Sequence, residues 1–178
     1  MKIFLICGKS GSGKGEVANI IKEYFIYKKE NTVITEFSKP LKAFAKELTD
    51  WNGELSAKPR GYLQGLGDKI RSIDEKFFIN SMLNDLRMYE NLTNNVVISD
   101  VRFPMEIDDI KTAYDNVYAI YVENNFSQSK LSITEQTHIT ETALDSYNDF
   151  DYMIVNDNYE SLRDKVFKIM EEVMKDEN

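Results

Sequence analysis

The first glycine-rich stretch of the chain, Gly8-Lys9-Ser10-Gly11-Ser12-Gly13-Lys14-Gly15, combines residue types that can bind an anion. Its four glycines within eight residues let the backbone adopt positive φ values, so that successive N–H groups can converge on one anion. Lys14 adds a mobile ammonium group, and a helix that starts directly after the loop would add its positive N-terminal end. The stretch therefore predicts a phosphate-binding loop. The residues expected to contact the phosphates are Gly8, Ser10, Gly11, Ser12, Gly13, Lys14, Gly15 and Glu16.

The segments on either side of this loop have the pattern that such a loop requires. The apolar run 3–7 is typical of a buried strand, and residues 16–25 repeat apolar side chains at intervals of three and four, which is typical of a helix. The spacing from Gly8 to Lys14 fits the first seven positions of the P-loop motif, whereas the eighth, usually Ser or Thr, is Gly15. An ordinary strand-to-helix turn is the simpler alternative, but it needs only one glycine and gives no reason for Lys14.

A carboxylate follows a second buried strand, which is predicted at residues 96–99 and runs into Asp100-Val101-Arg102-Phe103-Pro104. Open α/β sheets place their ligands at the carboxyl ends of the strands. Asp100 is therefore a candidate for organising Mg²⁺ beside a phosphate-binding loop. The alternative is a turn acid or an N-cap, because the next helix is expected to start near Glu106.

A third group of polar side chains lies within residues 58–71, where glycines are mixed with Arg60, Gln64 and Arg71. The planar guanidinium group of arginine can bind a phosphate with two parallel hydrogen bonds. The segment is thus a candidate for binding a second phosphate. A solvated helix face is the alternative, because exposed arginines are common.

Residues 123–142 are polar, show no clear period and are long for a connection within one domain. They are a candidate lid over the phosphates, although the only firm cation among them is Lys130. His138, the only histidine of the chain, lies in this segment and is followed by Glu141. With no other histidine to complete a ligand set, we expect His138 to form a hydrogen bond within the loop rather than to bind a metal.

Segments typical of strands and of helices alternate along the chain. Besides the first strand, strands are predicted at 32–37, 96–99, 117–122 and 152–155. One of the intervening helices is expected to begin after Ser38 as N-cap, with a buried face formed by Leu41, Phe44, Ala45 and Leu48. This alternation predicts an α/β protein with a parallel sheet that is covered by helices on both faces.

The length and composition restrict the class of protein. A chain of 178 residues fits one domain, or one domain with an inserted lid, and 42% hydrophobic residues exclude a disordered chain. No apolar run approaches the ~20 residues needed to cross a bilayer, and the single Cys7 favours a cytoplasmic protein. The net charge of −8 disfavours nucleic acid polymers as partners, so a phosphate ligand must be held by a local site.

Taken together, these segments resemble the P-loop nucleoside monophosphate kinases, and most closely the phage and bacterial deoxynucleoside monophosphate kinase family. The strand ending in Asp-Val-Arg-Phe-Pro, with the later His and Glu, is a much narrower signature than the P-loop alone. The matching pieces follow in order over nearly the whole chain: Gly8 to Ala18, Phe37 to Lys42, Tyr62 to Asp68 with Arg71, Val97 to Glu106, and His138 to Glu141 through Asn156-Asp157.

The resemblance implies a three-layer P-loop NTPase fold with a five-stranded parallel sheet in a single domain, residues 1–178. A helical segment at about 38–72 would bind the monophosphate, and a lid-like loop would span about 123–142. The implied reaction transfers the γ-phosphoryl group of ATP, with Mg²⁺, to a small-molecule nucleotide. Related enzymes can pair as homodimers, and neither a nucleic acid polymer nor a membrane is expected as a partner.

The resemblance also assigns roles to individual residues. Lys14, Asp100 and Arg102 would be catalytic, with Asp100 holding Mg²⁺ through water and Arg102 bridging donor and acceptor. The turn Asn156-Asp157 would lie against the adenine. The side chains implied to bind the acceptor are Lys42, Arg60, Gln64, Arg71 and Arg102.

Two features depart from the family pattern. Glu16 stands where these kinases tend to have a threonine, and the lid lacks their usual arginines. A nucleotide-binding module without turnover is therefore one alternative. The other is a kinase of a different small phosphate, such as phosphomevalonate, whose family shares the P-loop and a similar Asp-X-Arg strand end.

Overall fold

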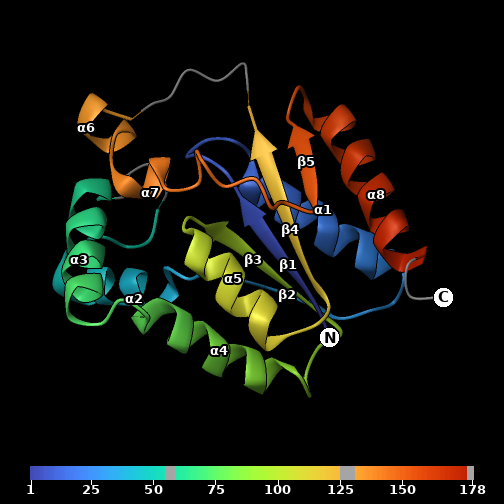
Figure 1. Ribbon diagram of the computed structural model, residues 1–178, viewed down its shortest axis with the longest axis horizontal. Helices are drawn as coiled ribbons and strands as arrows, with labels where there is room; N and C mark the ends of the chain where they lie inside the picture. Colours follow the sequence, from blue (N-terminus) through green and yellow to red (C-terminus); the bar gives the residue numbers. More distant parts are fainter. Residues whose placement is uncertain (55–58, 125–130, 176–178) are drawn as a thin grey trace.

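A five-stranded sheet forms the centre of the computed structural model, which describes residues 1–54, 59–124 and 131–175 (Figure 1). All strand pairs are parallel, in the order β2-β3-β1-β4-β5, so the predicted α/β fold with a five-stranded parallel sheet is confirmed. The strands are β1 (Lys2–Cys7), β2 (Thr32–Thr35), β3 (Asn95–Val101), β4 (Val117–Glu123) and β5 (Tyr152–Val155).

Helices cover both faces of this sheet. One face packs against α1 (Lys14–Tyr27) and α8 (Tyr159–Lys175), and the other lies under α4 (Phe77–Tyr89) and α5 (Pro104–Ala113) (Figure 1). The remaining helices lie to one side of the sheet in Figure 1: α2 (Lys39–Leu48), α3 (Arg60–Ile73), α6 (Ile133–Gln136) and α7 (Ile139–Thr142). In the described part of the chain, no helix has both the length and the apolar character needed to cross a membrane.

The apolar sequence of β1 reflects its burial on both faces. Ile3, Leu5 and Cys7 point into the core beneath α4 and α5, because alternate side chains of a strand point to the same face. Phe4 and Ile6 point into the opposite core, which α1 and α8 complete. A strand buried on both faces needs no polar alternation, which explains the continuous apolar run.

The strand order places the first loop at a crevice. β1 lies between β3 and β4, and the connection through α5 runs from β3 past β1 to β4. Where connections leave in opposite directions, parallel sheets open a crevice at the carboxyl ends of their strands. The loop after β1, the loop after β2 and the end of β3 therefore meet at this edge of the sheet.

The region around α2 differs from the sequence prediction in three details. Leu41 and Ala45 are buried as expected, but Phe44 is 46% and Leu48 66% exposed, because the helix buries only a narrow stripe. Ser38 is the N-cap residue, as predicted, but its side chain forms no capping hydrogen bond. β2 ends at Thr35 rather than at residue 37, since the N–H groups of the following loop bond to a side chain on β3 instead of continuing the strand.

Candidate functional site

The loop between β1 and α1 has a backbone that only glycine can readily adopt at several positions. Gly8, Gly11 and Gly13 have φ values of +132°, +79° and +103°. A Cβ atom on Gly8 would lie 2.4 Å from the carbonyl oxygen of Val122, and one on Gly13 would lie 2.3 Å from Nδ2 of Asn156. The loop is therefore packed closely against the ends of β4 and β5, as the glycine spacing predicted for a tightly curled loop.

The ammonium group of Lys14 is buried inside this loop. Its Nζ atom donates hydrogen bonds of 2.7 Å to the carbonyl oxygens of Gly8 and Lys9, and the residue is 8% exposed. Burial, followed by the nearby positive charge of Arg102, lowers the pKa of Lys14 to about 7. A bound anion would reverse this effect, because a negative charge nearby favours the charged ammonium.

A cleft of about 570 Å³ extends from the loop toward α2 and α3. It brings together most of the residues that the sequence singled out at four separate places in the chain. Those that line it are Ser10, Gly11, Gly13, Lys14, Gly15, Glu16, Lys42, Arg60, Gln64, Arg71, Asp100 and Arg102. Gly8 and Ser12 belong to the loop but lie outside this lining.

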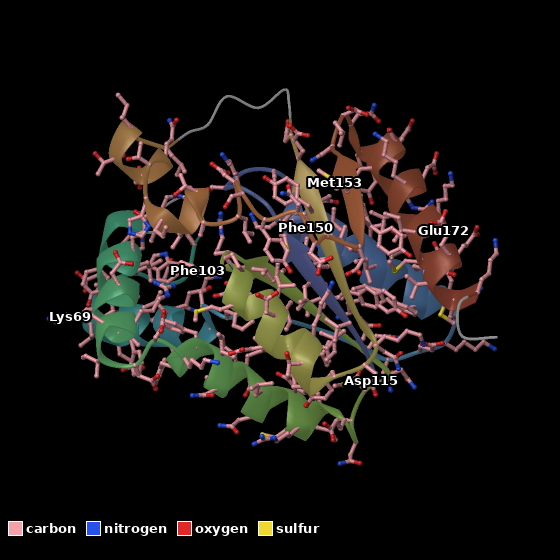
Figure 2. All side chains as sticks on the ribbon, in the orientation of Figure 1. Lys69, Phe103, Asp115, Phe150, Met153 and Glu172 are labelled. Atoms are coloured by element: carbon pink, nitrogen blue, oxygen red, sulfur yellow. The ribbon has the colours of Figure 1, made fainter. Side chains whose placement is uncertain are left out.

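Arg71 is held on the far wall of the cleft by two aromatic rings. Its guanidinium carbon lies 5.0 Å from the ring centre of Phe78 and 4.5 Å from that of Phe103. Phe103 lies between α3 and the start of α5, whereas Lys69 lies on the outer side of α3 (Figure 2). Burial lowers the pKa of Arg71 below its ordinary value. A rigid, partly desolvated guanidinium group of this kind is suited to binding a phosphate.

Arg60 and Lys42 line the same cleft. Nη1 of Arg60 donates to Oγ of Ser10 at 3.1 Å, so this arginine touches the glycine loop itself. Lys42 pairs with Glu36 beside the cleft. The cations predicted for the acceptor are thus spread from the glycine loop to the far wall.

Asp100 binds the backbone that leads into α2. Its Oδ1 accepts a hydrogen bond of 2.7 Å from the N–H of Phe37, and its Oδ2 accepts one of 3.1 Å from the N–H of Ser38. The carboxylate lines the cleft and also holds the backbone before α2 against β3. The sequence did not predict these hydrogen bonds of Asp100 to the backbone. The Mg²⁺ role of Asp100 stays a prediction.

Arg102 points from the end of β3 into the centre of the site. Its Nη1 lies 3.2 Å from the carbonyl oxygen of Gly8, 3.3 Å from that of Thr140 and 2.9 Å from Oε1 of Glu141. Arg102 therefore joins the glycine loop to α7. It also lines the cleft, and the role of bridging donor and acceptor that the family resemblance implies for it stays a prediction.

Glu106 fixes the backbone of this strand end. Its Oε2 accepts hydrogen bonds from the N–H groups of Arg102, at 2.7 Å, and Phe103, at 3.1 Å. Burial raises the pKa of Glu106 to about 7, and the neighbouring Asp100 charge acts in the same direction. Sequence reasoning missed this residue, although its place in the first turn of α5 is typical of a helix-capping acid.

Glu141 is the other functional residue that sequence reasoning left without a role. Its Oε2 accepts a hydrogen bond of 2.7 Å from the N–H of Ser10 in the glycine loop, and its side chain is 8% exposed. The only sequence signal for Glu141 was that the segment from His138 to Glu141 resembles the family.

His138 forms the hydrogen bond that was expected within its own loop and a second one outside it. Nδ1 lies 3.0 Å from Oγ1 of Thr140, and Nε2 lies 2.8 Å from Oδ2 of Asp68 on α3. Among the described residues, no cluster of His, Cys, Asp and Glu could hold a metal ion. Lys130 and the rest of 125–130 in the expected lid lie outside the described residues.

The turn after β5 supports the loop from the other side. Nδ2 of Asn156 donates to the carbonyl oxygen of Ser12 at 3.0 Å, and Asp157 pairs with Lys165. A second cavity of about 570 Å³ lies beside this edge, with Tyr121, Tyr147 and Phe150 among its walls. Met153 lines this cavity as well, and Figure 2 shows Phe150 and Met153 next to β4 and β5. Neither Asn156 nor Asp157 lines either cavity, and their contact with adenine stays a prediction.

A family of known proteins matches most of this chain. The model of the deoxynucleotide monophosphate kinase family matches residues 21–166, a range that begins after the glycine loop. None of the curated proteins matches the chain.

Several solved structures share the fold at low sequence identity. TT1252 from Thermus thermophilus has a TM-score of 0.57 at 14% identity, with 95% of each chain covered. Shikimate kinase from Aquifex aeolicus vf5 has a TM-score of 0.53 at 15% identity, with 96% of each chain covered. The Mycobacterium tuberculosis APS kinase CysC in complex with AMPPNP and APS has a TM-score of 0.54 at 11% identity, covering 98% of this chain and 97% of that one. These likenesses confirm the P-loop kinase fold.

Proposed function

Because the chain belongs to the deoxynucleotide monophosphate kinase family, we propose that it transfers the γ-phosphoryl group of ATP to a deoxynucleoside monophosphate. The family and the fold already support a phosphotransferase of the nucleotide kinase type. The observation that carries the finer proposal is the cleft in which a glycine loop with a buried lysine faces Arg60 and Arg71. Such a cleft has cationic groups for two separate phosphates.

The donor phosphates fit the glycine loop. The N–H of Ser10 already binds a carboxylate at 2.7 Å, which shows that the loop presents a donor suited to an anionic oxygen. Lys14 keeps one of its three protons for a phosphate after it has donated two hydrogen bonds to the loop. The solved APS kinase with AMPPNP, an ATP analogue, supports a nucleoside triphosphate as the donor.

The residues near the loop also fit Mg²⁺. The hydroxyl of Ser12 is buried and has no hydrogen-bond partner among the described residues, and Asp100 lines the cleft. Asp100, through water, or Ser12 would hold the ion together with the phosphates. When bound, Mg²⁺ would neutralise part of the phosphate charge.

The acceptor would bind in the helical segment at about 38–72. Arg71 and Arg60 would bind its phosphate, with Gln64 and Lys42 on the same wall. Arg102 lies between the two phosphate sites and would stabilise the charge on the transferred group. Phosphoryl transfer depends mainly on such positioning and charge stabilisation, because the protein forms no covalent bond to the group.

A coupled assay of ADP release from ATP and Mg²⁺ tests the proposal. The acceptors to compare are the deoxynucleoside monophosphates, their ribose counterparts and isoprenoid phosphates. Stimulation by at least one deoxynucleoside monophosphate is expected. Stimulation by isoprenoid phosphates alone would favour the phosphomevalonate-like alternative, and ATP binding without stimulation by any acceptor would favour a binding module.

A further inference from the structure

The carboxylate of Glu141 occupies the donors that an anionic ligand of the glycine loop would use. One oxygen accepts the N–H of Ser10 at 2.7 Å, and the other pairs with Nη1 of Arg102 at 2.9 Å. An N–H group makes one strong hydrogen bond at this distance. A phosphate oxygen and Glu141 therefore cannot both accept from Ser10 at full strength.

Glu141 also lies where two cavities meet. Ser10 and Glu141 line both the cleft toward α3 and the cavity beside β4 and β5, each of about 570 Å³. A ligand that reaches from one cavity along the loop into the other must pass the Glu141 side chain. A triphosphate is such a ligand, since it is elongated and would follow the loop.

The charges around Glu141 explain why it lies there in the free protein. Arg102 and the ammonium form of Lys14 concentrate positive charge at the loop, and a buried cationic site without an anion is unfavourable. The carboxylate supplies the missing anion from within the chain. The phosphates of a bound nucleotide would supply it from outside and would repel Glu141.

We propose that Glu141 is an internal competitor for the donor nucleotide, which is displaced from Ser10 and Arg102 when the phosphates bind. This inference rests on the proposed binding of ATP to the glycine loop. Displacement frees the Arg102 guanidinium to bind the phosphates in place of Glu141. It also moves Glu141, and with it α7, away from the place where the two cavities meet.

Binding measurements without acceptor test the displacement. Calorimetric titrations with ATP and with inorganic tripolyphosphate compare the native chain with Glu141→Gln, which keeps the size of the side chain but removes its charge. The substitution replaces the charge-assisted hydrogen bond between Ser10 and Glu141 by a weaker, neutral one. The side chain is then easier to displace, so both ligands should bind about tenfold more tightly. Glu172→Gln is the matched control, because Glu172 is exposed on α8 and lines neither cavity. It should change either affinity by less than about twofold.

The outcomes separate this inference from the proposed function. Equal or weaker binding by Glu141→Gln, or an equal gain in Glu172→Gln, would overturn the displacement while leaving ATP binding to the loop intact. The absence of ATP binding in every folded variant would overturn both.

The amide resonance of Ser10 gives a second, structural readout. In the free proteins its proton should lie further downfield in the native chain than in Glu141→Gln, because the bond to a carboxylate is stronger. With saturating tripolyphosphate the two resonances should coincide, since both amides then face the same phosphate. Resonances that stay apart at saturation would show that Glu141 remains in place, which contradicts the proposal.

Discussion

The ammonium group of Lys14 donates a 2.7 Å hydrogen bond to the carbonyl oxygen of Gly8, six residues earlier in the same loop. A second bond of equal length reaches the carbonyl oxygen of Lys9. The loop thus curls around the side chain that it is expected to present to a phosphate. The lysine is fixed in position before any ligand binds, so little of its side-chain freedom remains to be lost on binding.

Replacement of this lysine should abolish most of the activity. We predict that Lys14→Ala lowers kcat by about 10²- to 10³-fold, because Lys14 touches charge that develops during transfer. Lys22→Ala is the control, since Lys22 is exposed on the same helix. ADP release at saturating substrates measures the effect, and circular dichroism checks the fold. An unchanged kcat would remove the loop from the mechanism.

Asp100 should affect stability as well as turnover. Asp100→Asn keeps one acceptor oxygen but turns an NH₂ group toward Phe37 or Ser38, whose N–H groups both need an acceptor. We expect a loss of about 1–3 kcal/mol in the free energy of unfolding, measured by urea denaturation, together with a lower kcat. Asp115→Asn serves as the control because Asp115 is an exposed acid in the connection after α5. Unchanged stability in Asp100→Asn would show that these two hydrogen bonds contribute little.

The glycine loop and the sheet could be predicted because their signals are local. The curl between Gly8 and Lys14 depends on residues within one short stretch, and the apolar run of β1 predicts a strand buried on both faces. Apolar periodicity was less informative for α2. It marks which side chains share a face, but not how wide the neighbouring surface is, and Phe44 and Leu48 therefore remain exposed.

The contacts that complete the site could not be predicted in this way. Glu141 and Ser10 are 131 positions apart, and Asp100 and Phe37 are 63 apart. Whether such residues meet depends on the strand order, in which β3 and β4 flank β1. Periodicity does not encode this order. The strand-end pattern selected Asp100 and the family resemblance selected Arg102, but neither revealed that Glu141 would bind the loop.

The buried Glu106 should make stability depend on pH. Its pKa is raised to about 7 in the folded chain from 4.5, so the fold binds its proton more tightly than the unfolded chain does. The protonated acid contributes stability that is fully present below pH 4.5 and is lost as the pH rises through about 7. Glu106→Gln keeps an acceptor for the N–H groups of Arg102 and Phe103 but cannot ionise.

We therefore expect Glu106→Gln to match the native chain near pH 4.5 and to be more stable above pH 7, by up to about 3 kcal/mol. Urea denaturation of both proteins between these pH values measures the difference, because the contributions of other groups cancel in the comparison. A stability difference that does not change with pH would show that Glu106 titrates normally.

Arg71 should determine how tightly the acceptor binds. Its guanidinium group is held between Phe78 and Phe103, and in the proposed function it binds the acceptor phosphate in the ground state and the transition state alike. We predict that Arg71→Ala raises the KM for the acceptor about 10- to 100-fold with a much smaller change in kcat. Arg71→Lys should recover little of this loss, because lysine provides neither the planar stacking nor the two parallel hydrogen bonds. Arg87→Ala, at an exposed position on α4, is the control. If acceptor kinetics in Arg71→Ala match those of this control, the acceptor phosphate binds elsewhere in the cleft.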